Sequence, residues 1–188
     1  MLQVGITEAG DAALDLSWVG RLKPANVIIS KSSSGSFNRA LLENRERIIY
    51  HCTITGFGGS RVEPRVPRPR EMFSSLRHLI NNGFPPEQVV LRIDPIVPTL
   101  KGLRTAGSIL DELTKFPVRR VRYSFLDMYP HVKKRFAAAG IPLPYGTFVA
   151  PLEMQDSALR LLSGYDFEFE SCAENTPHKT GCISPKDR

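Results

Sequence analysis

One stretch near the middle of the chain alternates strand-like and helix-like patterns, and this alternation restricts the possible folds most strongly. An isoleucine-rich run at 47–55 predicts a strand. After Pro69, apolar residues recur at helical spacing and predict a helix that Asn82-Gly83 ends. A second short apolar run covers 89–93, and Pro95 predicts its end. A strand, a helix and a strand in this order predict a parallel pair with a right-handed crossover.

The same alternation continues on both sides of that stretch. Further strands are predicted at 2–6, 26–30, 119–126 and 166–171, and further helices at 37–45, 102–115, 131–139 and 151–163. Strands that alternate with helices predict an α/β architecture with a parallel sheet. Six such units in 188 residues suit a partial (β/α)6 TIM-like barrel better than a complete eight-unit one. An open doubly wound sheet is the alternative, although no G-x-G-x-x-G fingerprint follows the first strand.

Length and composition favour a single domain with its own core. A hydrophobic share of 41% and a charged share of 23% exclude a disordered chain, and 1–188 is expected to be one domain. Residues 175–188 form a polar tail that could be the edge of a truncation. No apolar run approaches the roughly 20 residues that cross a bilayer, and the N-terminus lacks a signal-peptide pattern. We therefore expect a cytoplasmic protein without a membrane partner.

The formal net charge of +6 permits a polyanionic partner, such as nucleic acid, without requiring one. Much of the excess positive charge lies at 61–70, 119–122 and 133–135, and a solvated surface is the simpler interpretation of the last two segments. The first segment carries the arginines that could contact nucleic acid or an anionic small molecule, namely Arg61, Arg65, Arg68 and Arg70. The sequence does not predict an oligomeric state.

If all strands are parallel, their carboxyl ends bring polar residues to one rim, where chemistry takes place in such folds. These residues are Thr7, Glu8, Lys31, Thr53, Thr55, Arg92, Asp94, Ser124, Asp127, Glu170, Cys172 and Glu174. Lys31 and Arg92 could pair with a carboxylate or phosphate. Asp94, Asp127 and Glu170 are the candidate general bases of a metal-independent enzyme. A purely structural role, such as an Arg92–Asp94 ion pair, has about equal weight for any single residue.

Three segments resemble the radical S-adenosylmethionine superfamily, in particular its spore photoproduct lyase-like branch. They are VIISKS at 27–32, TITGFGGSRVEPRVPRPREMFSSLRHLINNGF at 53–84 and LRIDPIVPTL at 91–100. Two further segments, SFLDMYPHVKKRF at 124–136 and FESCAE at 169–174, resemble a family of uncharacterised bacterial and viral proteins that share this core. The resemblance covers most of the chain and implies a partial barrel of about six units.

The resemblance also implies S-adenosylmethionine and a [4Fe–4S] cluster at the carboxyl rim, with reductive cleavage to a 5′-deoxyadenosyl radical. Lys31 matches a lysine near the S-adenosylmethionine carboxylate. Thr53 or Thr55 falls where a small hydroxyl residue contacts the same cofactor, and Arg92, like Asp94, lies on the strand beside the adenosyl group.

The cysteines depart from the pattern of that superfamily. Its C-x-x-x-C-x-x-C loop is absent, and Cys52, Cys172 and Cys182 are not spaced to replace it. They are also an odd number, without a disulfide or zinc spacing, which favours free thiols in a reducing compartment. The chain could be a fragment of a radical enzyme or a degenerate barrel that lost the cluster. Alternatively, the three cysteines meet at the rim and hold a cluster together.

Three functions remain open from the sequence. The first is a radical S-adenosylmethionine-like enzyme, or a fragment of one, that acts on a nucleic-acid base, a nucleotide or another anionic substrate. The second is a cluster-free barrel that binds a nucleotide or nucleic acid without catalysis. The third is a metal-independent enzyme with Asp94, Asp127 or Glu170 as general base.

Overall fold

The computed structural model describes residues 4–7, 10–172, 174, 176–181 and 184–187. Its centre is a six-stranded sheet in which strands that follow each other in the sequence pair side by side, always in parallel. The strands are β1 (Val4–Ile6), β2 (Ala25–Ser30), β3 (Ile48–Thr53), β4 (Val89–Ile96), β5 (Arg120–Phe125) and β6 (Glu168–Ser171). The α/β class and the parallel sheet expected from the sequence are confirmed.

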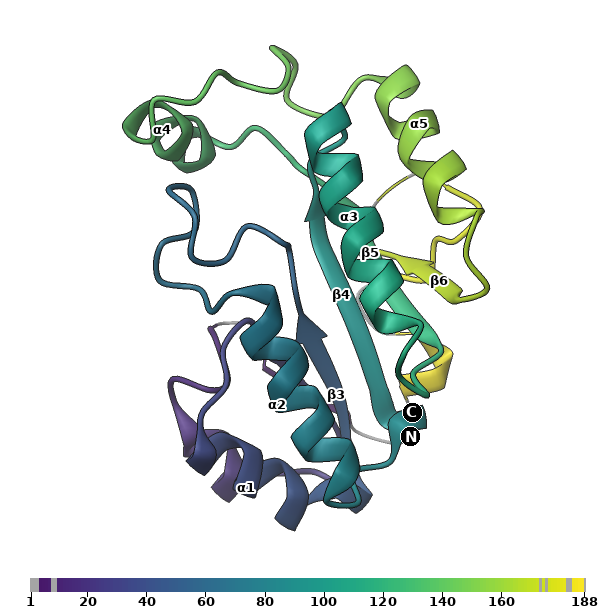
Figure 1. The fold of residues 1–188 in the computed structure, drawn as a ribbon. Helices are drawn as coiled ribbons and strands as arrows, with labels where there is room; N and C mark the ends of the chain where they lie inside the picture. Colours follow the sequence, from purple (N-terminus) through teal and green to yellow (C-terminus); the bar gives the residue numbers. More distant parts are fainter. Residues whose placement is uncertain (1–3, 8–9, 173, 175, 182–183, 188) are drawn as a thin grey trace.

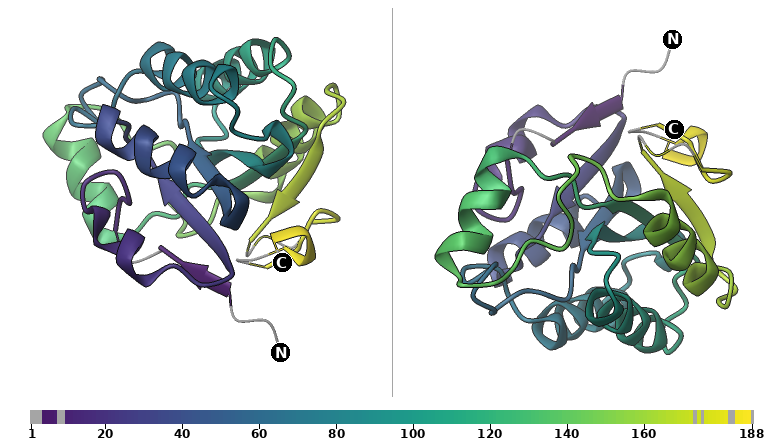
Figure 2. Two further views of the ribbon diagram at one scale, coloured as in Figure 1. Left: turned by 90° about the horizontal axis from the view of Figure 1, so that it is seen from below. Right: turned by 90° about the horizontal axis from the view of Figure 1, so that it is seen from above.

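Helices follow the strands along the chain. They are α1 (Gly35–Glu43), α2 (Pro69–Asn81), α3 (Leu100–Leu113), α4 (Pro130–Ala138) and α5 (Leu152–Leu162), with short 3-10 turns η1 (Leu16–Arg21), η2 (Arg45–Arg47), η3 (Pro86–Gln88) and η4 (Pro185–Asp187). Helices α1, α2, α3 and α5 lie along the outside of the curved sheet (Figures 1 and 2). Helix α4 instead stands beyond the carboxyl ends of the strands (Figure 1). The arrangement is that of a partial (β/α) barrel.

Alternation along β3, β4 and β5 separates an apolar outer face from an inner face that carries polar and charged side chains. On β3, Tyr50 and Cys52 belong to the hydrophobic core under the helices, and the ring of Phe37 from α1 packs against Tyr50. On the inner face, Thr53 pairs in register with Arg92, and Arg92 pairs with Arg122. The inner face therefore carries charged side chains in the interior, which packed apolar side chains fill in a complete barrel.

The short turn η4 near the end of the chain lies at the gap that the incomplete barrel leaves between β1 and β6 (Figure 2). Ser171 at the end of β6 exchanges backbone hydrogen bonds with the tail, donating to His178 and accepting from Thr180. The guanidinium of Arg122 donates to the carbonyl of Gly181 at 2.6 Å. The tail thus forms part of the wall that encloses the charged inner face.

Strand β4 does not end at Pro95, as the sequence predicts, but continues to Ile96. The Asp94–Pro95 peptide bond is cis, and the register with β5 shifts between Ile93 and Ile96. The shift lets the strand pass a residue that cannot donate a ladder hydrogen bond, and Ile96 then pairs with Phe125.

Candidate functional site

A cavity of about 470 Å³ opens where the chain leaves β2, β3, β4 and β5. Its wall is mostly apolar and comprises Phe57, Val62, Pro95, Val97, Leu126, Tyr129, Val132, Phe136, Ile141, Pro142 and Pro144. Its charged and titratable lining residues are Lys31, Glu63, Asp94, Lys101, Asp127, His131 and Arg135. An apolar enclosure with a few polar groups is the usual form of a small-molecule site.

Glu63 joins two strand ends at this cavity. Its Oε1 lies 3.4 Å from Nζ of Lys31, which follows β2. Its Oε2 accepts a short hydrogen bond from the hydroxyl of Thr55, which follows β3. The carboxylate of Glu63 is only 13% exposed, so the ammonium and the hydroxyl replace the water that it loses.

The loop between β3 and α2 carries Glu63 and folds back on itself. Gly59 donates to the carbonyl of Glu63 at 3.0 Å, and Gly58 forms an isolated bridge with the same residue. A Cβ on Gly58 would lie 1.9 Å from the carbonyl oxygen of Pro67, so only glycine fits this approach. The turn thus brings the carboxylate of Glu63, which follows β3 by ten residues in the sequence, back to the end of that strand.

Asp94 lies at the carboxyl end of β4 and has partners on both carboxylate oxygens. One oxygen accepts a short hydrogen bond from the guanidinium of Arg92, and the other accepts one from the hydroxyl of Ser124 on β5. Burial alone would raise the pKa of Asp94, but the charge of Arg92 and the hydrogen bond from Ser124 outweigh it and lower that pKa. Asp94 is therefore an ionised, fully engaged group.

Asp127, which follows β5, differs from the other two carboxylates that line the cavity. Its side chain makes no ion pair or hydrogen bond with the rest of the described chain. Burial raises the pKa of Asp127 above the usual aspartate value. It is the candidate base with an accessible lone pair and a direct opening to the cavity.

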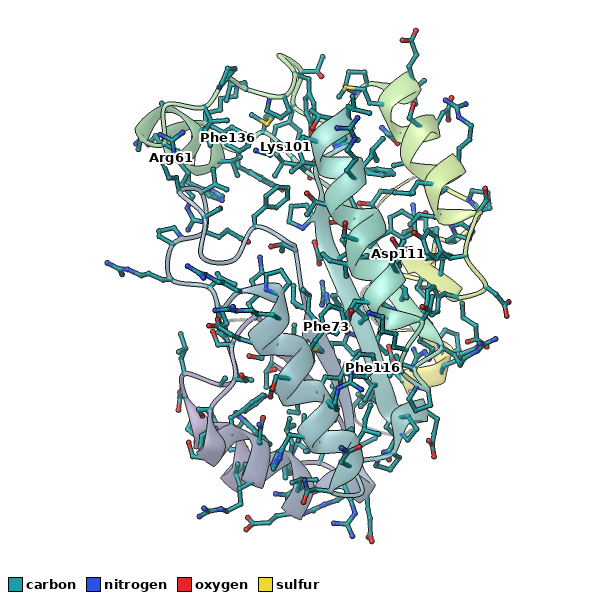
Figure 3. The ribbon with its side chains drawn as sticks, viewed as in Figure 1. Arg61, Phe73, Lys101, Asp111, Phe116 and Phe136 are labelled. Atoms are coloured by element: carbon teal, nitrogen blue, oxygen red, sulfur yellow. The ribbon has the colours of Figure 1, made fainter. Side chains whose placement is uncertain are left out.

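Aromatic side chains cover the cavity on the side of α4. The rings of Tyr129 and His131 stack with centroids 5.6 Å apart at 12°, and Phe148 meets Tyr129 edge-on at 4.9 Å. Phe136 from α4 completes this wall, and Figure 3 shows it at the same end of the molecule as Lys101. Such rings offer flat apolar faces to a ligand.

The structure brings together only part of the rim expected from the sequence. Lys31, Thr55, Asp94 and Asp127 line the cavity. Thr53 and Arg92 lie one layer deeper, side by side in the sheet, and Arg92 reaches the site through Asp94. Of the remaining rim candidates, Ser124 lines the cavity and Glu8 lies outside the described residues. Thr7 and Glu174 accept hydrogen bonds from the backbone N–H groups of Ile29 and Phe125, which are structural roles.

Glu170 does not line this cavity. It is buried on the inner face of the sheet, where it binds Arg120 at 3.0 Å and Arg122 at 2.6 Å. The expectation that the basic segment at 119–122 is a solvated surface was wrong for these two arginines, which are 6% and 1% exposed. The alternation of side chains along β5 directs both arginines to the inner face. Glu170 of β6 and Asp187 of the tail offset the cost of burying their charges.

Asp187 from η4 completes this inner charge cluster. It accepts from Arg120 at 2.7 Å and lies 3.6 Å from Nε2 of His51. Burial raises the pKa of Asp187, but the nearby His51 ring and the hydrogen bond from Arg120 outweigh this effect, so the pKa is lowered. Burial also lowers the pKa of His51, and the charges of Arg92 and Arg122 add to that shift, against the opposing effect of Asp187.

The buried His51 predicts a pH dependence of stability. The pKa of His51 is lower in the folded chain than in the unfolded chain. Between about pH 7 and 5, the His51 ring is therefore protonated in the unfolded chain but not in the folded chain. The free energy of unfolding should therefore decrease as the pH is lowered through that window, by at most about 1.4 kcal/mol per pH unit. Denaturant titrations of wild type and His51→Gln at several pH values check this.

The substitution His51→Gln should flatten the slope, because it removes the buried imidazole. The carboxylates of the cluster contribute in a lower window, because their stabilisation is lost only as pH falls below about 4. An unchanged slope in His51→Gln would show that another group titrates.

The cysteines do not meet at the rim in the part of the chain that the structure describes. Cys52 is buried in the outer core with Tyr50, and burial raises the pKa of its thiol to about 12. Cys172 is half-buried just past β6, and Cys182 lies outside the described residues. A cluster ligand must be a thiolate, so Cys52 does not fit the [4Fe–4S] group that the resemblance implies. No described set of three His, Cys, Asp or Glu side chains is arranged to hold a metal ion.

The loop before α2 and the first turn of that helix expose all four arginines named for an anionic partner, Arg61, Arg65, Arg68 and Arg70. Contact with nucleic acid through them stays a prediction. The residues at 133–135 on α4 are exposed, as expected from the sequence.

Several lining residues were not expected from the sequence, among them Glu63, Lys101 and Phe136. Glu63 follows a strand by ten residues, so strand-end reasoning could not reach it. The available signal was the glycine-rich turn before it, which predicts a loop that folds back.

Comparisons with known proteins give one match. A family model described as "Domain of unknown function (DUF1848)" matches residues 25–187. No curated protein and no solved structure matches the chain. None of the described helices is long and apolar enough to span a membrane.

Proposed function

The chain belongs to the DUF1848 family, and we propose that it binds a nucleoside-type small molecule in the cavity at its carboxyl rim. The observation that carries this proposal is the division of the cavity into two parts. One is an apolar, aromatic wall, and the other is a floor of hydrogen-bonded charged groups, namely Lys31, Glu63 and Asp94. This function corresponds to the cluster-free binding barrel among the three sequence-based hypotheses.

The volume and lining of the cavity support a ligand with a flat ring. Its volume of about 470 Å³ lies in the usual range for small-molecule sites, roughly 300–1,000 Å³. Phe57 and Phe136 provide aromatic surface, and Pro95 and Val97 provide rigid apolar surface. A nucleobase buries both of its faces well in such surroundings, since aromatic stacking adds to the gain from apolar burial.

The floor supports a polar group attached to that ring. Lys31 and Glu63 present an ammonium and a carboxylate side by side, 3.4 Å apart. This pair complements an amino-acid moiety such as that of S-adenosylmethionine. Lys31 would bind the ligand carboxylate and Glu63 the ligand ammonium, so that two intermolecular ion pairs replace the internal one. Adenosine, which lacks these charges, would leave the internal pair intact.

We expect Lys31→Ala to weaken binding of S-adenosylmethionine by about 10- to 100-fold. That range corresponds to the roughly 1.5–3 kcal/mol of a hydrogen bond to a charged group. Adenosine should lose less than about threefold, because it does not need the ammonium. Isothermal titration calorimetry with each ligand, on wild type and variant, measures both effects.

The matched control is Lys134→Ala, which removes an equal charge from an exposed position outside the cavity. It should leave both dissociation constants within about twofold of wild type. If wild type binds neither adenosine nor S-adenosylmethionine at millimolar concentration, the proposed function is wrong. If Lys31→Ala and Lys134→Ala behave alike, the floor does not bind the amino-acid group.

A further inference from the structure

We propose that the rim cavity prefers ligands that carry a phosphate group, and that Lys101 and Arg135 bind this phosphate. The inference rests on the proposed function and specifies which nucleosides the same site takes, namely their monophosphates. It derives from the charges that line the cavity and from how many of them the protein already neutralises.

Two of the three cavity carboxylates are already neutralised within the protein. Glu63 pairs with Lys31, and Asp94 pairs with Arg92. Lys101 and Arg135 also line the cavity, but no ion pair joins either of them to another described residue. After Asp127 is set against one of them, the lining together with Arg92, which lies one layer deeper, keeps one positive charge that solvent or a ligand must balance.

The two cations reach the cavity from different elements. Lys101 belongs to the first turn of α3, and Arg135 belongs to α4, which stands beyond the carboxyl ends of the strands (Figures 1 and 3). Both residues are exposed and line the same open cavity, so they can bind one anion from two directions. A single surface helix rich in lysine would not provide this arrangement.

Helical spacing explains why only some of the basic residues of α4 take part. His131 and Arg135 are four residues apart and share one helix face, and both line the cavity. Lys133 and Lys134 lie between them in sequence, on other faces, and neither lines the cavity. Arg135 is thus directed by the helix repeat, and its two neighbours serve as internal controls of equal charge.

A phosphate monoester matches this pair better than a single carboxylate does. It carries about −1.5 to −2 charges near neutral pH and has three acceptor oxygens. The guanidinium of Arg135 can donate two parallel hydrogen bonds, and the ammonium of Lys101 adds a compact point charge. A nucleoside monophosphate carries this group on the ring system that the apolar wall favours.

The test compares the affinities of adenosine and adenosine 5′-monophosphate by isothermal titration calorimetry at low and at physiological salt. Wild type should bind the monophosphate at least about tenfold more tightly, and the ratio should shrink as salt rises. Lys101→Ala combined with Arg135→Ala should remove this preference, so that the variant binds the two ligands with affinities that agree within about twofold. Lys133→Ala combined with Lys134→Ala should keep the preference. Thermal melts verify that all variants are folded.

Each contrary outcome has a distinct meaning. Equal affinity of wild type for both ligands overturns the phosphate preference but leaves the nucleoside site in place. Equal loss in the two double variants also overturns it, because the preference would then come from general surface charge. Binding of neither ligand overturns the proposed function and the inference together.

Discussion

Replacement of Glu170 by alanine is expected to lower the free energy of unfolding by about 3–5 kcal/mol. The carboxylate binds two arginines that are almost fully buried, Arg120 and Arg122. Without it, both guanidiniums keep their charge because arginine does not deprotonate in proteins. Asp187 alone cannot balance two buried cations, so the inner face would have to admit water or open at the tail.

Chemical denaturation of wild type and variant at pH 7 measures this loss. The matched control is Glu168→Ala on the same strand, whose pair with Lys186 is more than half exposed and should contribute less than about 1 kcal/mol. The two substitutions remove the same carboxylate from positions two residues apart. The difference between their losses in unfolding free energy therefore reports the effect of burial. A loss below about 1 kcal/mol for Glu170→Ala would mean that the inner cluster is hydrated and weak.

The same variant separates a structural role from a catalytic one. Glu170 was a candidate general base on sequence grounds, yet it lies outside the cavity and both of its oxygens are engaged by arginines. Burial alone would raise the pKa of Glu170, but Arg122 and Arg120 lower it, so the group is a poor proton acceptor. We therefore expect ligand binding at the rim to survive in whatever fraction of Glu170→Ala remains folded.

The second large effect is expected for Phe37→Ala, at about 3–5 kcal/mol. Phe37 is fully buried on α1 and meets two aromatic rings edge-on, Trp18 at 6.2 Å and Tyr50 at 5.7 Å. Tyr50 in turn meets Phe84 at 6.3 Å. Removal of the Phe37 ring leaves a cavity and breaks the ring contacts that join η1 and α1 to β3.

Thermal and denaturant unfolding of Phe37→Ala provide the measurement. Leu152→Ala is the control, since Leu152 is 76% exposed and should contribute less than about 0.5 kcal/mol. Phe37→Leu, which keeps most of the volume, should lose less than half as much as Phe37→Ala. Similar losses for Phe37→Ala and Leu152→Ala would contradict the packing described for α1.

Most elements could be predicted because their signals are local. Helix α2 begins at Pro69 and ends before Gly83, whose φ of +89° allows the turn that the Asn82-Gly83 pair predicts. Strand β5 covers most of the predicted run at 119–126. Of the site, Lys31, Thr55, Asp94 and Asp127 were found by one rule, that parallel strands end at one rim.

The sequence by itself determined the order and type of the elements, and hence the parallel sheet, because periodicity and turn residues act between close neighbours along the chain. Only the tertiary structure decided which charges are paired. Arg122 and Glu170 are 48 residues apart and meet through strand register, while Glu63 reaches Lys31 through a loop that folds back. Pairing depends on distances in space and on the water that each group loses on burial, and neither quantity is encoded in local spacing.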